Sequence, residues 1–142
     1  MMAPFDEIRR TAPPGTVGRP PTGIGADIGD VARREVSLQR GPGFAAEVFT
    51  EEERRYCEAQ ARPPLHYAAR FAAKEAFLKA LGLGLFSGVE LRDIEVLRDL
   101  EGRPRFRLGD SAASALARAG GAAPLLSLSH DGPCALAFVV VP

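Results

Sequence analysis

The sequence shows no excess of charge of either sign. Its 142 residues contain 18 Lys and Arg and 18 Asp and Glu, so the formal net charge at pH 7 is zero. Proteins that bind nucleic acid or anionic membranes usually carry a broad basic field, and this composition gives no argument for either partner. Any anion-binding site in this chain must therefore be local.

Cysteines and long apolar runs are also scarce. No run approaches the roughly 18 apolar residues that a membrane-spanning helix needs, so we expect no membrane segment. The two cysteines, Cys57 and Cys134, lie far apart and form no metal-ligand spacing, which favours packed thiols in a reducing compartment. The first residues include acids and lack the apolar stretch of a signal peptide. These features together predict a cytoplasmic protein.

Length and pattern predict one domain of the α+β class. Residues 1–22 are rich in Pro and Gly and are expected to form a flexible extension before a domain over residues 23–142. A helix is expected from Asp30 to Arg40, and a capping box at Thr50 begins another that ends near Ala61. Further expected elements are a strand over 22–28, a hairpin over 93–97 and 105–108, a helix over 111–119, and strands over 124–129 and 134–141. The last strand is nearly all apolar and is expected to be buried on both faces.

The central feature is a helix that begins at Pro63-Pro64 and ends before Gly82. Its helical spacing places Glu75 and Lys79 one turn apart, and Arg70 and Lys74 are paired in the same way. Phe71 and Leu78 lie between these charged rows, which is unusual for a solvated surface. The opposite, core-facing side is small and apolar and consists of Ala72, Ala73, Ala76, Phe77 and Ala80.

Lys74 and Lys79 are the only lysines among the 18 basic residues. Glu75 and Lys79 can be read simply as a surface pair worth about 0.2–0.5 kcal/mol. In an Arg-rich sequence, however, two retained lysines indicate a need for a compact ammonium or a proton donor, which guanidinium does not supply. Both interpretations remain open from the sequence.

Three polar clusters could support chemistry: Asp27, Glu75 with Lys79, and His130 with Asp131. The glycines around Asp27 do not have dinucleotide-binding spacing, and a carboxylate beside a phosphate requires a cation between them. Two carboxylates can hold Mg²⁺ when waters and substrate phosphates complete its six oxygens. His130 could equally be a hydrogen-bonded structural residue, and we expect the other histidine, His66, to be structural or exposed. The residues permit a Mg²⁺-assisted phosphate reaction without requiring it.

Three segments, Gly23–Ile28, Arg70–Gly82 and Ser127–Asp131, together resemble the holo-[acyl-carrier-protein] synthase family. These are the small, single-domain 4′-phosphopantetheinyl transferases, and the likeness covers roughly residues 23 to 141. The resemblance implies a small antiparallel sheet packed with the long central helix, in a homotrimer whose active sites lie at subunit boundaries. Phe71 and Leu78 would then belong to an interface.

The resemblance also implies a reaction, the transfer of 4′-phosphopantetheine from coenzyme A to a serine of an apo acyl carrier protein, with release of 3′,5′-ADP. Asp27 and Glu75 match the family's magnesium ligands, and Glu75 or a water that it polarises is the candidate base. Lys79 would neutralise or protonate the departing phosphate, and Asp131 would orient His130 or assist the base. The residues expected near the coenzyme phosphates or the reacting groups are Arg70, Lys74 and His130.

The helix after Asp30 matches the family's carrier-docking helix, which makes Arg33, Arg34, Arg40 and Phe44 the docking candidates. The same arginines could be only the solvated side of a helix. The sequence departs from the family pattern at three positions. Asp30 replaces the more usual Glu near the metal, Leu83 replaces a common Thr, and Glu47 occupies a position that is often basic.

Two other functions remain possible from the sequence. The first is a non-catalytic module of the same fold that binds carriers or coenzyme A, against which the intact Asp27, Glu75 and Lys79 argue. The second is a Mg²⁺-dependent nucleotide hydrolase, for which the sequence offers no phosphate-cradling glycine loop.

Overall fold

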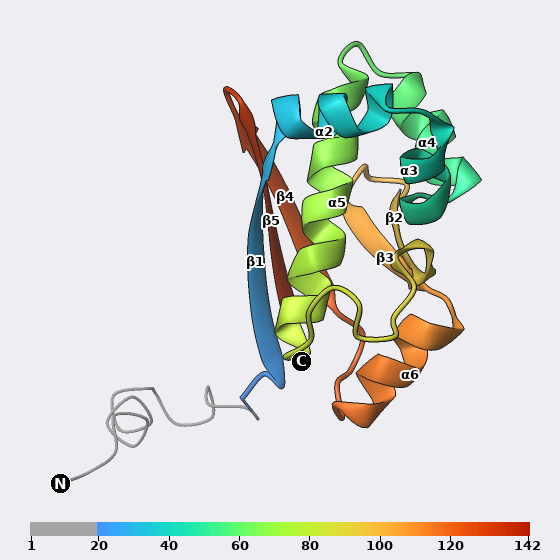
Figure 1. The fold of residues 1–142 in the computed structure, drawn as a ribbon. Coiled ribbons are helices and arrows are strands. Elements are labelled where there is room, and N and C mark those ends of the chain that lie inside the picture. The colour runs from blue at the N-terminus through green and yellow to red at the C-terminus, as the bar shows by residue number, and fades with distance from the viewer. Residues whose placement is uncertain (1–19) are drawn as a thin grey trace, which may run out of the picture.

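Helix α5 (Pro63–Ala80) runs between two small antiparallel sheets in the computed structural model, which describes residues 20–142 (Figure 1). The remaining elements, in chain order, are β1 (Gly23–Asp30), α2 (Val31–Gln39), α3 (Pro42–Val48), α4 (Glu51–Glu58), the 3-10 turn η1 (Leu91–Asp93), β2 (Ile94–Arg98), β3 (Pro104–Leu108), α6 (Asp110–Arg118), β4 (Leu125–Asp131) and β5 (Cys134–Val141). The α+β class and the long central helix are confirmed. Most of the expected extension over residues 1–22 lies outside the described residues.

The larger sheet has the order β1-β5-β4, and the hairpin β2-β3 forms the second sheet. Asp27 of β1 pairs with Ala137 of β5, which pairs in turn with Leu128 of β4. Helices α2, α3 and α4 gather around one end of α5, and α6 lies near the other end (Figure 1). Within residues 20–142, no helix combines the length and apolar character needed to cross a membrane.

Strand β1 lies directly against α5 because three of its residues have no side chain. A Cβ at Gly23 would overlap the carbonyl oxygen of Ala80, and one at Gly25 would overlap that of Ala76. Gly29 approaches the carbonyl of Ala68 in the same way. The alternation of a strand places Asp27 on this same helix-facing side. The glycines therefore bring the Asp27 carboxylate to α5.

Local sequence signals account for the helix starts. The Asp30 carboxylate accepts a hydrogen bond from the Arg33 N–H at 2.9 Å and caps α2. Thr50 and Glu53 form the expected capping box at the start of α4. Pro63 occupies the first turn of α5, as predicted.

Four expectations about burial and secondary structure are wrong. Arg70 and Lys74 do not form an exposed charged row, because both are buried. Leu78 is also buried, in the core with Phe77 and Ile94, so it does not belong to an exposed interface. Strand β5 alternates between buried and exposed residues instead of being covered on both faces. Helix α3 was not predicted, because Pro42 and Gly43 resemble a break although Pro42 serves as its first-turn residue.

Candidate active site

The ammonium of Lys79 binds the carboxylate of Asp27 across the contact between α5 and β1. Its Nζ donates to Asp27 Oδ1 at 2.9 Å and to the Ala26 carbonyl oxygen at 3.1 Å. The Lys79 side chain is 54% exposed, whereas that of Asp27 is 13% exposed. The hydrogen bond from Lys79 to Asp27 raises the pKa of Lys79, so the ammonium stays charged near neutral pH. These two bonds leave one ammonium N–H available to solvent or a ligand.

Glu75 lies one helical turn before Lys79 and faces the same Asp27. Partial burial, followed by repulsion from the Asp27 carboxylate and a shared hydrogen bond with it, raises the pKa of Glu75. Lys79 and Arg34 oppose this shift. A divalent cation between two carboxylates held this close would relieve their repulsion. Among residues 20–142 no cluster of three or more His, Cys, Asp or Glu is present, so other oxygens would have to complete a Mg²⁺ shell.

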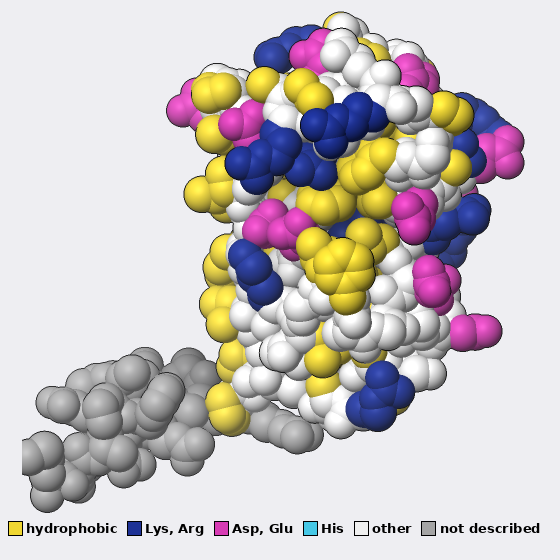
Figure 2. Space-filling model, viewed as in Figure 1, with side chains coloured by type: hydrophobic (Ala, Val, Ile, Leu, Met, Phe, Trp, Pro, Cys, Tyr) yellow, Lys and Arg dark blue, Asp and Glu magenta, His cyan; other side chains and the backbone are white. Residues whose placement is uncertain are grey.

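Arg34 of α2 connects this acid pair with an apolar hollow. Its guanidinium carbon lies 4.2 Å from the centre of the Phe71 ring and 5.5 Å from that of Phe44. The carboxylates of Glu75 and Asp27 are close enough to act on its charge. Phe44 and Phe71 line a hollow of about 530 Å³, which the exposed loop residues Leu85 and Phe86 also border. On this face, a small acidic group lies between basic side chains and beside an apolar patch (Figure 2).

The other docking candidates lie along the same helix. Arg33 and Arg40 are exposed on or directly after α2, and Phe44 is half-buried at the start of α3. Glu47, the departure from the family pattern, borders the hollow. Leu83 packs against the core around Phe77.

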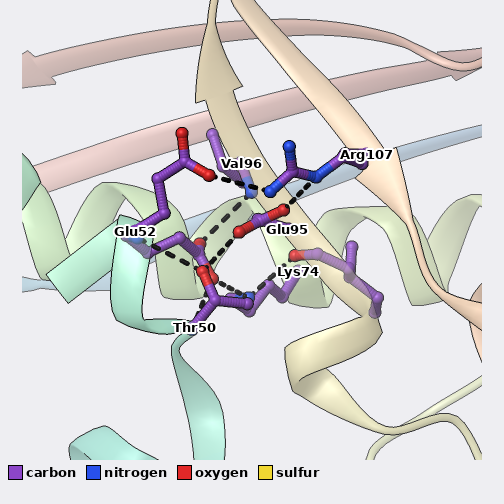
Figure 3. A network of polar contacts seen from close by, with 8 residues as sticks. Thr50, Glu52, Lys74, Glu95, Val96 and Arg107 are labelled. Carbon is purple, nitrogen blue, oxygen red and sulfur yellow. Dashed lines mark hydrogen bonds and ion pairs between the residues drawn. The ribbon is translucent and has the colours of Figure 1, made fainter.

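Lys74 is held in a buried polar network on the other side of α5 (Figure 3). Its Nζ donates to Glu53 Oε1 at 2.8 Å and to the carbonyl oxygens of Leu91 at 2.8 Å and Ile94 at 2.7 Å. These bonds use all three ammonium donors, and the side chain is 0% exposed. The structure therefore does not place Lys74 where it could contact a coenzyme phosphate, and it gives Lys74 a structural role.

The network extends from Lys74 to the surface. Glu53 Oε2 also accepts the Val96 N–H at 3.2 Å, which ties α4 to β2. Thr50 donates to Glu95, which in turn accepts from Arg107 at 2.6 Å. Sequence reasoning missed Glu53 as the partner of Lys74 and Glu95 as a further member of the network. The capping box identified Glu53 only as a local helix cap, and Glu95 gave no signal beyond its place in a strand.

Arg70 is almost fully buried, yet two of its donors are free. Its guanidinium carbon lies 4.0 Å from the centre of the Tyr56 ring. Its Nε and Nη1 atoms find no hydrogen-bond partner among residues 20–142. Arg70 lines a hollow of about 190 Å³ together with Tyr56 and Arg98. A buried guanidinium with free donors beside a hollow suits an anionic ligand.

His130 and Asp131 are at the end of β4, away from the acid pair of the same chain. His130 pairs with Ala135 of β5, which pairs with Gly29 of β1, so two strand spacings, about 10 Å, separate it from β1. Helix α5 packs on β1 and β5 at this point. His130 instead acts electrostatically on His66, which is also influenced by Arg70. One chain thus carries two separate polar sites, Asp27-Glu75-Lys79 and the group around Arg70 and His130.

Comparisons with known proteins identify the family of this chain. The family model described as the 4′-phosphopantetheinyl transferase superfamily matches residues 23–137. A holo-[acyl-carrier-protein] synthase from a Geobacter species is 46% identical over 120 residues, covering 84% of this chain and 96% of the relative. One from Methylobacterium radiotolerans is 48% identical over 124 residues, covering 84% and 91%.

Solved structures show the same fold. The holo-[acyl-carrier-protein] synthase of Neisseria meningitidis matches with a TM-score of 0.79 and 35% identity, over 87% of this chain and 99% of that one. The Helicobacter pylori synthase in complex with coenzyme A matches with a TM-score of 0.74 and 28% identity, over 84% and 99%. This chain therefore belongs to the holo-[acyl-carrier-protein] synthase family of the 4′-phosphopantetheinyl transferase superfamily.

Proposed function

We propose that this protein transfers 4′-phosphopantetheine from coenzyme A to a serine of an apo acyl carrier protein and releases 3′,5′-ADP. The observation that carries the proposal is the meeting of Asp27, Glu75 and Lys79 at the contact of β1 with α5, in a chain of this family. Relatives are named for this activity, and several structural neighbours contain coenzyme A.

Asp27 and Glu75 are the residues that would hold Mg²⁺. Their fit is supported by the raised pKa of Glu75, because a bound cation would relieve the repulsion between the two carboxylates. When bound, Mg²⁺ would supply positive charge to the coenzyme diphosphate. Asp30, which caps α2 through its carboxylate, is a poor candidate for direct coordination.

Residues of the chain itself carry out the remaining steps of the transfer. The carrier serine oxygen forms a bond to the β-phosphorus of coenzyme A, and the bond from that phosphorus to the oxygen bridging to 3′,5′-ADP breaks. The serine proton passes to Glu75 or to a water that Glu75 polarises. Lys79, charged and half-exposed, donates to the departing phosphate. No covalent enzyme intermediate is needed, because positioning and charge stabilisation suffice.

Arg70 and His130 are proposed to bind other parts of the coenzyme from a neighbouring subunit. Within one chain they are separated from the acid pair by α5 and, for His130, by two strand spacings of the sheet, so a single chain does not assemble all the predicted residues around one ligand. A homotrimer with sites at its subunit boundaries would bring the Arg70 and His130 group of one subunit to the acid pair of the next. Asp131, beside His130, would assist in orienting it.

The outer face of the larger sheet supports such an assembly. Ile24, Ile28, Leu125, Leu136 and Phe138 all point to this face, and between 40% and 69% of each is exposed. Apolar side chains line the edge of the molecule along the outer side of β1 (Figure 2). Contiguous exposed apolar surface of this kind marks an association site. Phe71, in contrast, lies under Arg34 and beside Phe44, where carrier docking is proposed.

The carrier is proposed to dock on Arg33, Arg34 and Arg40, with Phe44 as the apolar contact. Arg34 joins this surface to Glu75, so a carrier bound there would deliver its serine beside the acid pair. Because the whole protein is neutral, a local basic surface is needed to guide an acidic partner. We further propose a cytoplasmic location, which remains a prediction from the sequence.

Mass measurement of the carrier tests the proposal directly. The protein is incubated with coenzyme A, Mg²⁺ and a panel of apo carrier proteins from fatty acid and polyketide systems. Addition of a phosphopantetheine group to at least one carrier is expected, with one equivalent of 3′,5′-ADP. If coenzyme A and carriers bind but no carrier gains mass, the protein is a non-catalytic binding module. Phosphate release from nucleotides without a carrier would instead support a hydrolase.

Glu75→Gln sharpens this test. The substitution keeps the side-chain volume and removes its charge, so we expect transfer to fall about 1000-fold or more while the far-UV spectrum and melting temperature are retained. Arg118→Gln, an exposed change on α6, serves as the control and should retain activity. Transfer at the parental rate by Glu75→Gln would contradict the assignment of Glu75.

A further inference from the structure

Arg34 differs from the other two arginines on or directly after α2 in where it lies. Arg33 and Arg40 are exposed, whereas Arg34 is half-buried. Helical spacing places Arg34 on the same face as Val31 and Leu38, which both pack in the hydrophobic core. A guanidinium on the inner face of a helix is not simply a solvated charge, so its position calls for a specific role.

The Arg34 side chain meets α5 at one end of a row of functional residues. Its guanidinium carbon lies 4.2 Å from the centre of the Phe71 ring. Phe71, Glu75 and Lys79 follow one another at intervals of four residues, so they share one face of α5, with about 6 Å between successive positions. Glu75 therefore lies between two cations, Arg34 toward the start of the helix and Lys79 toward its end. On this face the small acidic group is flanked by basic side chains (Figure 2).

The electrostatic effects on Arg34 agree with this placement. Burial lowers the pKa of Arg34, and among the charged groups that act on it Glu75 has the largest effect and favours the cation. Asp27 also favours the cation, and Arg33 opposes it. An arginine remains charged near neutral pH in spite of such shifts. Arg34 is therefore a second positive charge at the acid pair, on the side opposite Lys79.

The donors of Arg34 are not used by the protein itself. Its Nε is buried and finds no hydrogen-bond partner among residues 20–142. Contact with the Phe71 and Phe44 rings positions the guanidinium but satisfies none of its N–H groups. Within the same described residues, Asp27 forms its ion pair with Lys79 and not with Arg34. A half-buried guanidinium with unused donors beside the acid pair suits an anionic ligand.

We propose that Arg34 is a catalytic residue that donates hydrogen bonds to the transferred phosphoryl group of the coenzyme while the carrier serine attacks it. The inference rests on the proposed function, in which Lys79 donates to the departing phosphate. As the serine oxygen bonds to the β-phosphorus and the bond to the oxygen of 3′,5′-ADP breaks, negative charge is spread over the non-bridging oxygens of that phosphorus. Arg34 forms no covalent bond and gives up no proton, and its planar set of donors matches the geometry of phosphate oxygens.

The order of groups along α5 gives the two cations different tasks. Lys79, at the end of the row, meets the phosphate that leaves. Arg34, at the start of the row, meets the phosphoryl group that remains on the pantetheine. Because Arg34 belongs to the helix on which the carrier is proposed to dock, it lies on the side from which the serine approaches. Arg34 therefore stabilises charge at the entering side of the phosphorus, and Lys79 does so at the leaving side.

Steady-state kinetics of Arg34→Met, compared with Arg33→Met, test this assignment. Methionine keeps an unbranched stem against Phe71 and Phe44 and removes the donors. At saturating coenzyme A, Arg34→Met should lower kcat about 100-fold and change the KM for the carrier by less than about threefold. Arg33→Met, an exposed change at the neighbouring position, should raise the KM for the carrier about tenfold and leave kcat within about threefold. Arg118→Gln on α6 should behave like the parent.

Two further variants of Arg34 separate a contact with the phosphoryl group from a role in folding. Arg34→Lys keeps the charge without the planar donor set, so its kcat should fall only about tenfold. Arg34→Ala should regain part of its kcat when guanidinium ion is added at concentrations far below those that unfold proteins, whereas Arg33→Ala should not respond. The far-UV spectrum and melting temperature of Arg34→Met should match those of the parent.

Calorimetric binding in the presence of Mg²⁺ supplies a readout that does not depend on turnover. Coenzyme A contains the transferred phosphoryl group, and 3′,5′-ADP lacks it. Arg34→Met should therefore weaken binding of coenzyme A about fivefold and leave binding of 3′,5′-ADP within about twofold. Equal weakening of both ligands would place Arg34 at the departing phosphate and overturn the proposal.

The kinetic results can also overturn it. An Arg34→Met variant with the kcat of the parent, or one that changes only the KM for the carrier as Arg33→Met does, would make Arg34 a docking residue alone. A lower kcat accompanied by a lower melting temperature and no response to guanidinium would make its role structural. In each case the parent transfers phosphopantetheine normally, so the inference fails while the proposed function stands. A parent protein that transfers nothing to any carrier would overturn both.

Discussion

The two lysines of this chain lie five residues apart in one helix and have opposite surroundings. Lys74 is fully buried, and its three donors are bound by Glu53 and two carbonyl oxygens. Lys79 is 54% exposed and, within residues 20–142, binds only Asp27 and one carbonyl oxygen. A lysine side chain therefore holds neighbouring elements together at position 74 and is a candidate reactant at position 79. The number of acceptors around each ammonium, and not the local sequence, decides which.

The two sides of α5 are also built differently. Toward β1 the contact is made by glycines and alanines, which allow close backbone approach, and Lys79 and Asp27 form a hydrogen-bonded polar pair across it. On the side of Lys74, a charged network joins α5 to α4, η1 and β2. The first contact sets the distance from Asp27 to Glu75 and Lys79. The second holds the part of α5 that carries Glu75 against the rest of the domain.

The largest effect on stability is expected from Lys74→Met. The substitution leaves the Glu53 carboxylate buried without its cation, which should lower the free energy of unfolding by about 3–5 kcal/mol. Urea denaturation followed by circular dichroism measures the change. A decrease in the free energy of unfolding of less than about 1 kcal/mol would mean that Glu53 binds another partner and that the network does not hold α5 in place.

A somewhat smaller effect is expected from Gly25→Ala. The added methyl group collides with the Ala76 carbonyl oxygen, so β1 must move away from α5 at a cost of about 3 kcal/mol. Because Asp27 is two residues away on the same face, divalent-ion binding should weaken as well. Gly84→Ala is the matched control, since no atom lies within 4 Å of the point that its new methyl group would occupy. It should change stability by less than about 1 kcal/mol. Equal effects of the two substitutions would contradict the close-approach argument.

Lys79→Met should change stability least. The Lys79–Asp27 pair is largely open to solvent on the lysine side, so its loss should cost no more than about 1 kcal/mol. Transfer activity should nevertheless fall by about 100-fold, because the departing phosphate loses its donor. Steady-state kinetics with a carrier protein that accepts phosphopantetheine measure the activity, and thermal melting measures the stability. The same measurements on Lys74→Met distinguish the roles of the two lysines. The comparison fails if Lys79→Met destabilises the fold as strongly as Lys74→Met.

The sequence predicted those parts of the molecule that depend on local signals. The helix start at Asp30, the capping box at Thr50, the prolines at the start of α5 and the β2-β3 hairpin all appear where expected. The glycines of β1 were recognised as unsuitable for a dinucleotide, but their contact with the carbonyl groups of α5 depends on tertiary packing. The burial of Lys74 and Arg70 was missed for the same reason, since helical spacing alone cannot distinguish a solvated charged row from one covered by α4 and β2.

For strand β5 the sequence predicted more burial than the structure shows. Its apolar composition predicted burial on both faces, yet Leu136 and Phe138 are exposed in one chain. The outward-facing apolar side chains of this strand would be buried only if another surface packed on the sheet. A single sequence does not identify that surface. The division of the predicted site into two groups, with His130 remote from Asp27, could not be deduced from the order of the motifs either.

Binding of Mn²⁺, followed by electron paramagnetic resonance in the presence of coenzyme A, tests the central claim most directly. The parent protein should bind one ion per chain, Asp27→Asn and Glu75→Gln should each weaken binding at least about tenfold, and Glu51→Gln, an exposed acid on α4, should leave it unchanged. Equal Mn²⁺ affinity in the parent and in both site variants would contradict the assignment of Asp27 and Glu75 as the metal ligands.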